Sequence, residues 1–269
     1  MTRLRVLLLA LLGSLVCAGG ALAAYPGTYG MQGGGGVLSS DGSVRFTASG
    51  SGSTTLLTSL HGGRLLHSRV VAGTFGIPTM IMEGTGLGLF HDGRTLVLQS
   101  VANRRTTSFA LVRTADLRVR QRITLRGSYA FDAVSPNGRR LYLIQHRSED
   151  FQHYVVRAYD LRARRLLPGR IADKAQSSWV MQGYPVSRVE TADGRWVYTL
   201  YANPAGFPFV HALDTMKGVA HCVGIAWTGS QDELTSYRLR VAGNRLLVLR
   251  GSGATYRSID RTNWSVRLR

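Results

Sequence analysis

Hydrophobic and polar residues follow one form that occurs five times along this chain. Each copy has an apolar stretch, a turn that pairs Gly with Asp or Asn, and a second apolar stretch such as RTLVL or RRLYLI. Asn-Gly and Asp-Gly favour the positive φ angles of a tight hairpin turn, and alternation after the turn is typical of a strand. The five turns lie 45 to 56 residues apart, at Asp41, Asp92, Asn137, Asp193 and Asn244.

A second hairpin is predicted after each of these turns, in stretches such as VVRAYDLRARRLL and VHALDTMKGVAHCVGI. Two hairpins per repeat give four strands, so five repeats give about twenty strands. No stretch shows the 3.6-residue period of an amphipathic helix. An Asp precedes the second turn at Asp160, Asp214 and Asp260, and Asp116 lies close to the equivalent position.

Four-stranded units of this kind bury their faces and protect their edges when they are arranged radially around one axis. We therefore predict an all-β protein, a β-propeller of five four-stranded blades that forms a single domain over residues 37–269. The five turns should then lie around one rim. A pair of β-sandwiches or an open solenoid is the alternative architecture. The long links 72–89 and 172–188 also allow a different division into blades.

The third and fourth repeats resemble a known family. The string AVSPNGRRLYLI is followed by VVRAYDLRARRLL, and VETADGRWVYTL is followed by FVHALDT. These strings are similar to YVTN-type β-propeller repeats of exported bacterial proteins, in which an "spDGr-lyv" hairpin precedes a "v-viD-t" hairpin. The resemblance covers most of residues 37–269 and implies a propeller fold rather than an activity. Such propellers often have more repeats, and this chain has no room for six or seven.

The first residues have the form of a secretory signal peptide. Arg3 and Arg5 precede an apolar run over 6–16, and small residues follow up to Ala23. The apolar run is about half as long as a bilayer crossing requires, so an uncleaved membrane anchor is the less favoured alternative. We predict a signal peptide over 1–23, a flexible Gly-rich lead over 24–36, and a secreted or extracytoplasmic location in the cell envelope.

Cleavage of the signal peptide would leave Cys222 as the single cysteine and exclude an intrachain disulfide. Its apolar neighbours AHCVGIAW favour a buried thiol over a nucleophile or a metal ligand. The histidines show none of the spacings of a zinc site, and we expect neither a metal nor a cofactor. The seven histidines are His61, His67, His91, His146, His153, His211 and His221.

The positive charge is large and comes almost entirely from arginine. The chain has 33 Lys and Arg residues against 15 Asp and Glu, a net charge of +18. Charged outer strands discourage aggregation between sheet edges, which is the first interpretation. Salt-sensitive attachment to an anionic polymer of the envelope is the functional one. Many of these arginines lie in second hairpins, at Arg113, Arg118, Arg120, Arg122, Arg157, Arg162, Arg164 and Arg165.

Three carboxylates are the weak candidates for catalysis. Glu83, Asp132 and Glu190 lie in or near the predicted inner strands. Two of them could act as acid and base, as in propeller glycosidases. The alternative that we favour is that each carboxylate pairs with an arginine near the channel.

The best candidate for a binding loop is the stretch YANPAGFPFVH, residues 201–211. Two prolines stiffen it, so its aromatic side chains could be displayed to a partner. The candidate binding residues are Tyr201, Phe207, Phe209 and His211. The alternative is that Phe207 and Phe209 pack between blades.

These observations favour a non-catalytic binding or scaffold module over a carbohydrate-active enzyme with carboxylates at the channel mouth. The expected partner is a protein or an envelope polymer, including an anionic cell-wall polymer. Nucleic acid is disfavoured because the charges are not interleaved with stacking aromatic residues. We expect a monomer.

Overall fold

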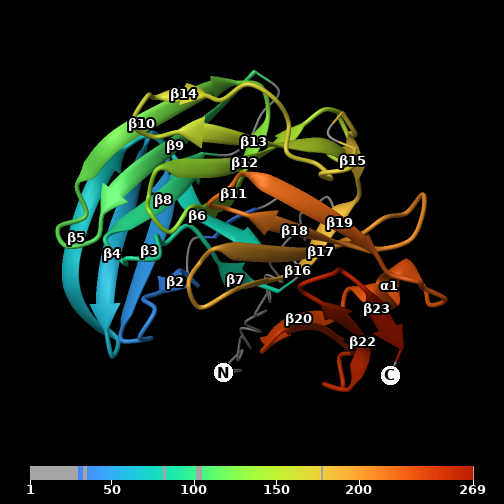
Figure 1. The fold of residues 1–269 in the computed structure, drawn as a ribbon. Helices are drawn as coiled ribbons and strands as arrows, with labels where there is room; N and C mark the ends of the chain where they lie inside the picture. Colours follow the sequence, from blue (N-terminus) through green and yellow to red (C-terminus); the bar gives the residue numbers. More distant parts are fainter. Residues whose placement is uncertain (1–29, 33–34, 81–82, 101–104, 177, 269) are drawn as a thin grey trace, which may run out of the picture.

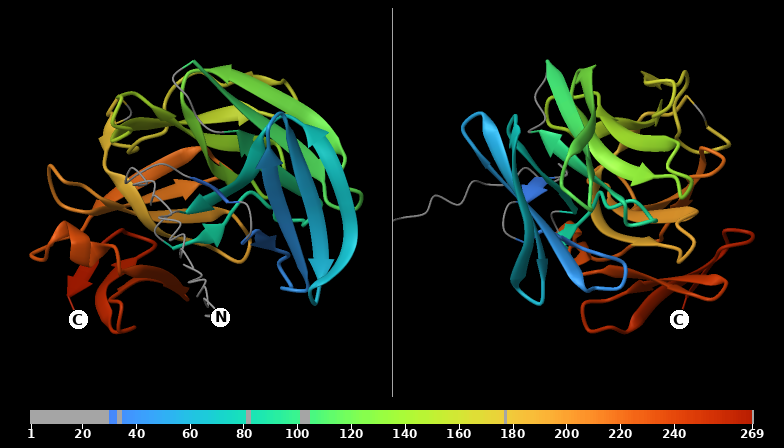
Figure 2. Two further views of the ribbon diagram at one scale, coloured as in Figure 1. Left: turned by 180° about the vertical axis from the view of Figure 1, so that it is seen from behind. Right: turned by 90° about the vertical axis from the view of Figure 1, so that its left-hand side faces the viewer.

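The computed structural model describes residues 30–32, 35–80, 83–100, 105–176 and 178–268, and the predicted signal peptide 1–23 lies outside them. In the described residues the strands form five sheets, which follow one another in chain order around an arc (Figure 1). The first sheet, blue to cyan, and the last, red, lie at the two ends of the arc (Figures 1 and 2). Five sheets of mainly antiparallel strands confirm the all-β prediction.

Each sheet is built mainly from consecutive strands. The first contains β2 (Val37–Leu38), β3 (Val44–Ser51), β4 (Thr54–His61) and β5 (Arg64–Ala72) in that order. The second has the order β1 (Gly30–Gln32), β6 (Phe75–Met80), β8 (Thr95–Ser100), β9 (Thr106–Arg113) and β10 (Val119–Arg126), with β7 (Thr85–Gly86) also paired to β6. Strand β1 therefore comes from the Gly-rich lead and pairs antiparallel with β6.

The other three sheets follow the same plan. The third contains β11 (Tyr129–Val134), β12 (Arg140–His146), β13 (His153–Asp160) and β14 (Arg165–Leu166), with β15 (Met181–Gln182) paired to β13. The fourth contains β16 (Tyr184–Glu190), β17 (Trp196–Ala202), β18 (Phe209–Asp214) and β19 (Val219–Gly224). The fifth contains β20 (Arg238–Ala242), β21 (Arg245–Leu249), β22 (Thr255–Asp260) and β23 (Val266–Leu268).

The helix α1 (Gln231–Leu234) is a single turn that connects the fourth and fifth sheets. Ser230 caps it, because its hydroxyl oxygen accepts a hydrogen bond from the Glu233 N–H. Among the described residues, no helix is long and apolar enough to cross a membrane.

The predicted turns connect β11 to β12, β16 to β17 and β20 to β21 in the last three sheets, while Asp41 lies between the short β2 and β3 and Asp92 lies between the short β7 and β8. In the third sheet, Ser135 donates to Asn137 Oδ1, which also accepts the Arg139 N–H. The same local hydrogen bonds form around Asp41 and Asp193. Polar side chains at these turns therefore satisfy their own backbone.

The turns of the second, third and fourth sheets lie close together on one side of the molecule. A Cβ atom at Gly194 would lie 3.2 Å from Nδ1 of His91 and 3.3 Å from Cγ of Pro136, the neighbours of the other two turns. The short distances between these turns support the prediction that the turns of these three sheets lie on one rim.

Consecutive sheets pack face to face through apolar side chains, so the second, third and fourth sheets bury residues on both of their faces and the first and fifth on one. In addition, Thr55 Oγ1 on β4 accepts the Phe75 N–H and donates to the Gly73 carbonyl oxygen, which joins the first sheet to the second. Thr107 makes the equivalent bond with the Tyr129 N–H and so joins the second sheet to the third. The apolar layers contain Phe46, Leu57 and Ile77 (first and second sheets), Phe109, Phe131 and Leu143 (second and third), Tyr142, Tyr201 and Phe209 (third and fourth), and Leu200, Tyr237 and Leu246 (fourth and fifth).

In four sheets, the turn within the second hairpin ends in a residue with left-handed backbone. Asp160, Asp214 and Asp260, which were predicted to precede this turn, each accept a hydrogen bond from a backbone N–H of the turn. Four residues later the chain takes a positive φ, at Arg164 (55°) and Gly218 (72°). Glycine adopts this conformation without strain, whereas other residues are strained there.

We predict that Arg164→Gly is more stable than Arg164→Ala by about 1 kcal/mol, because both remove the same side chain and only glycine relieves the left-handed strain. In the fourth sheet, Gly218→Ala should lose stability, since its new Cβ is strained and would lie 3.0 Å from Nη1 of Arg140. Urea unfolding of the three variants checks this. Equal stability of the two Arg164 variants would contradict it.

Candidate functional site

The three candidate carboxylates gather around one buried arginine. Arg188 lies on β16, and its side chain is 2% exposed. Its Nη1 lies 3.1 Å from Oδ1 of Asp132 on β11, and its Nη2 lies 3.6 Å from Oε1 of Glu190. Glu83 follows β6 and accepts the Arg188 backbone N–H at 3.3 Å. The inner ends of the second, third and fourth sheets therefore meet at this residue.

A second arginine joins the group from the fifth sheet. Nε of Arg238, at the start of β20, lies 3.8 Å from Oε1 of Glu83. Each of the three carboxylates thus has an arginine within 4 Å. The attraction between buried charges offsets the free-energy cost of their desolvation only while the partners stay in contact. These ion pairs therefore hold the inner strands of the sheets together.

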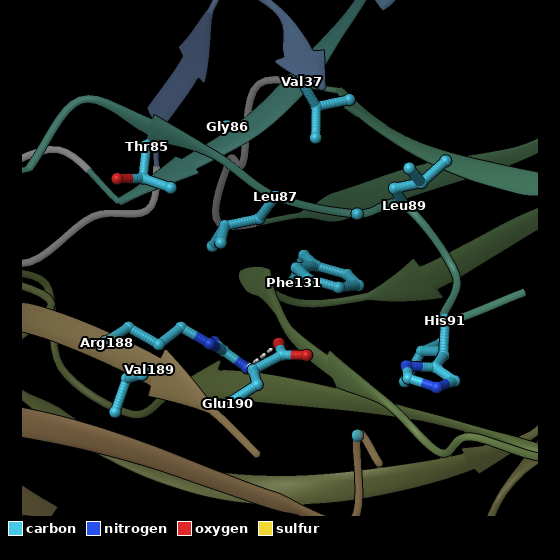
Figure 3. Close-up of a pocket in the computed structure, with 13 residues that line it drawn as sticks. Val37, Thr85, Gly86, Leu87, Leu89, His91, Phe131, Arg188, Val189 and Glu190 are labelled. Carbon is cyan, nitrogen blue, oxygen red and sulfur yellow. Dashed lines mark ion pairs between the residues drawn. The ribbon is translucent and has the colours of Figure 1, made fainter. Parts of the chain in front are cut away.

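A pocket of about 280 Å³ lies beside this group. Figure 3 shows Leu87, Leu89 and Phe131 on its walls, with the Arg188–Glu190 pair at one side. Its volume is close to the lower limit of small-ligand sites, roughly 300 Å³. Of the three carboxylates, Glu190 lines the pocket, whereas the Asp132 side chain is 3% exposed and lies among buried residues.

This geometry brings the carboxylates together, as an acid–base pair would require, but it also pairs each with a cation. A glycosidase needs a carboxylic acid and a carboxylate that both reach the substrate. Asp132 has little access to the pocket. The arrangement therefore resembles a structural salt-bridge network more than a hydrolytic site.

Two of the three aromatic side chains in residues 201–211 are not displayed as expected. Tyr201 on β17 is 1% exposed, and Phe209 on β18 is 4% exposed. The Tyr201 ring stacks between Tyr154 and Phe209, with centroids 5.1 Å and 5.2 Å away. Both rings fill the layer between the third and fourth sheets, so the expected display is wrong for them. The adjacent prolines made the segment look like a loop, although it contributes to two strands.

His211 is also buried, at 2% exposure, and Phe207 is the exposed member of the four, at 66%. Burial lowers the pKa of His211, and the charge of Asp132 acts in the opposite direction. His211 is therefore a core residue and not a displayed one. Phe207 alone of the four binding candidates is available to a partner in the described structure.

Cys222 is half-buried on β19 and pairs with no other cysteine in the described residues. Burial raises the pKa of its thiol, and the nearby Asp173 carboxylate acts in the same direction. The thiol is therefore protonated at neutral pH, as expected of a packing residue and not of a nucleophile. The described residues contain no group of three or more His, Cys, Asp or Glu side chains that could hold a metal ion.

The outer strand β10 and the turn before it carry a row of exposed arginines. The burial pattern of β10 alternates, with Ile123 buried and its neighbours exposed. Within the described part of the chain, Asp116 is the carboxylate that pairs with this row, through Arg118. The row comprises Arg118, Arg120, Arg122 and Arg126. The sequence pattern indicated the first three, whereas Arg126 joins them only through the observed length of β10.

Comparison with known proteins identifies the architecture. The propeller domain of Cps50 (Swd1) from Myceliophteria thermophila has a TM-score of 0.52 at 13% identity, over 90% of this chain and 71% of its own. The propeller of Dos1 has a TM-score of 0.52 at 9% identity, over 86% and 56%. The fold is a β-propeller.

At these identities the likeness shows the fold alone. TolB from Acinetobacter baumannii is a more distant match, with a TM-score of 0.46 and 14% identity, and this propeller covers 84% of its own chain and 54% of that of TolB. No protein-family model and no curated protein matches the sequence. Function must therefore be argued from the residues of this propeller.

We predict that the Arg188–Asp132 pair is coupled. Arg188→Met should destabilise the propeller by about 3–5 kcal/mol because it leaves Asp132 buried and unpaired. The double variant with Asp132→Asn should lose less than the sum of the two single variants. Chemical unfolding of the four proteins completes the cycle, and additive losses would show that the two side chains act independently.

A second prediction concerns pH. Burial lowers the pKa of His146 to about 4, against the opposing effect of its hydrogen bond with the Phe151 carbonyl oxygen. The unfolded chain takes up a proton on this residue below pH about 6.5, while the folded chain does so only near pH 4. Stability is therefore lost as the pH falls through this window, by about 3 kcal/mol from this residue.

In His146→Gln this part of the pH dependence should disappear. The matched control is His67→Gln on the exposed strand β5, which should keep the pH dependence of the parent. Urea unfolding at pH 7 and at pH 4.5 measures both. The same loss of stability in the parent and in His146→Gln would contradict the assignment.

Proposed function

We propose that this protein is an extracytoplasmic five-bladed propeller with YVTN-like repeats that binds an anionic polymer of the cell envelope and does not catalyse a reaction. The observation that carries the proposal is the arginine row along β10. The row places four exposed guanidinium groups along one outer strand and the turn before it, and so presents several charges to an extended polyanion. Guanidinium groups bind phosphate and carboxylate groups in a bidentate manner.

The surroundings of the row support this interpretation. Arg118, Arg120 and Arg126 are exposed, and β10 is the outermost strand of the second sheet. Arg122 instead donates to the Ala72 carbonyl oxygen at 2.8 Å, which fixes the row against the first sheet. The turn between β13 and β14 contains the exposed Arg162 and Arg164, and the exposed Arg165 begins β14 on the same outer side (Figure 1).

The extracytoplasmic location rests on the sequence of residues 1–23. The five-blade count rests on the five sheets of the described residues and on the five equivalent turns. The carbohydrate-active alternative has one observation in its favour, the convergence of Glu83, Asp132 and Glu190. The pairing of each with an arginine counts against it.

The test is the binding of polyphosphate at increasing salt concentration. Arg118, Arg120 and Arg126 are replaced together by Gln, while Arg122 is kept because of its structural contact. The control replaces three exposed arginines of other sheets, Arg64, Arg240 and Arg267, and so removes the same net charge. We expect the row variant to bind about tenfold more weakly, as three exposed charge contacts of about 0.5 kcal/mol each would give.

The control should bind within about threefold of the parent, because it leaves the row intact. Equal losses in both variants would show attraction by net charge alone and contradict a defined site. Hydrolysis of a carbohydrate that is abolished by Glu190→Gln, with polyphosphate binding unchanged, would favour the enzyme.

A further inference from the structure

The first sheet exposes aliphatic side chains on the face that points away from the second sheet. Leu38 and Leu56 are each 44% exposed, Leu65 is 54% exposed and Val70 is 64% exposed. A cluster of this kind on a folded surface marks an interaction site, because water contact with apolar area is costly. We name this surface, with Thr47 and Thr58 at its centre, the first-sheet face.

The strand register places these residues on one side. Leu56 lies opposite Val70, Thr58 lies opposite Thr47, and Leu60 lies opposite Leu65. Arg45 connects Leu60 to Leu38 across β3. Directly opposed residues of antiparallel strands point the same way, so the side chains form one continuous surface.

The other side of the same sheet shows what such a surface is for. Phe46, Ala48, Leu57 and Val71 are buried there and pack against the second sheet. The second to fifth sheets each pack against the sheet that precedes them in the chain. The first-sheet face is the corresponding surface at the start of the arc, where no sheet of the described residues precedes it (Figure 2). Its exposed leucines and valine are of the same kind as the apolar side chains of the established interfaces, with Thr47, Thr58 and Ser68 lying between them.

The charged residues on the two free sheet faces indicate which surface can cover the first-sheet face. In the fifth sheet, the side away from the fourth carries Arg240 and Arg267 in one row with Leu247 and Ser258. Packing these arginines on a face without a carboxylate would bury unpaired charge, which is unfavourable. The first-sheet face itself carries one ionisable residue among those aligned here, Arg45, whose Nη1 donates to the Gly35 carbonyl oxygen at its edge. A second copy of this face brings one arginine, which is already hydrogen-bonded at the edge, whereas the last sheet would bring both Arg240 and Arg267. The face therefore fits a second copy of itself better than the last sheet of another copy.

We propose that two copies of this propeller associate through their first-sheet faces about a two-fold axis. A two-fold contact uses the same patch on both subunits, so each exposed leucine and valine meets apolar side chains of the other copy. Strands β3 to β5 give a face of about 27 by 14 Å, or about 400 Å². Standard interfaces bury about 800 Å² per partner, so the dimer should be weak and form at micromolar concentrations or above. This differs from the monomer expected from the sequence, because sequence alone did not show that the face is uncovered.

Sedimentation equilibrium of the full chain over a range of concentrations tests the proposal. We expect a monomer–dimer equilibrium that Val70→Glu and Leu65→Glu each weaken at least tenfold. The matched control is Leu268→Glu on the fifth sheet, where the native leucine is 75% exposed. It should leave the dimer constant unchanged. Since the replaced residues are exposed, all three variants should melt close to the parent, and this is measured alongside.

Mixing separates the two geometries of self-association. Labelled Val70→Glu chain is titrated with unlabelled parent. A mixed dimer of the proposed kind has one intact face and one changed face, so it should be weaker than the parent dimer and stronger than the dimer of the variant. Mixed dimers as strong as those of the parent would show that the last sheet of the variant binds the first sheet of the parent, and would overturn the proposal. A parent that stays monomeric at every concentration would overturn it as well.

Discussion

The buried guanidinium of Arg188 is the contact on which the arrangement of the inner strands depends. It holds Asp132 of the third sheet and Glu190 of its own sheet, while its backbone N–H holds Glu83 beside the second sheet. Glu83 in turn reaches Arg238 of the fifth sheet. A charge that is 2% exposed must keep its partners, because losing one leaves the others desolvated without compensation. Four sheets are therefore fixed relative to one another by one group of ion pairs.

The same group limits what the channel mouth can do. The carboxylates that a hydrolase would use are the same groups that neutralise or contact Arg188. Their main role is therefore to stabilise the fold. The neighbouring pocket has mostly apolar walls and one accessible carboxylate, Glu190. Accessible charge is found instead on the outer strands, above all on β10, where arginines alternate with buried residues. This division favours binding over catalysis as the role of the propeller.

The ends of the arc add a constraint that interior sheets do not have. Every four-stranded sheet has two faces, and face-to-face packing covers both only for a sheet with neighbours on both sides. The first sheet retains exposed leucines, whereas the last exposes arginines on its free side. The exposed leucines of the first sheet suit an apolar partner surface, whereas the arginines of the last sheet suit water or an anion. The two ends of the arc are thus chemically different although both sheets follow the same strand order.

The sequence by itself determined the all-β class, the repeat and the turns, because these depend on neighbours a few residues apart. Asp-Gly and Asn-Gly turns and the Asp residues of the second hairpins satisfy their own backbone, as Asn137 and Asp160 show. Only the tertiary structure decided the roles of residues whose partners are distant in the chain. Asp132 and Arg188 form an ion pair although they lie 56 positions apart in the sequence. Tyr201 and Phe209, which the sequence predicted to be displayed on a loop, are packed in the layer between the third and fourth sheets. Exposure, ion pairing and the uncovered first-sheet face depend on which sheets are adjacent in space, and no local pattern encodes this.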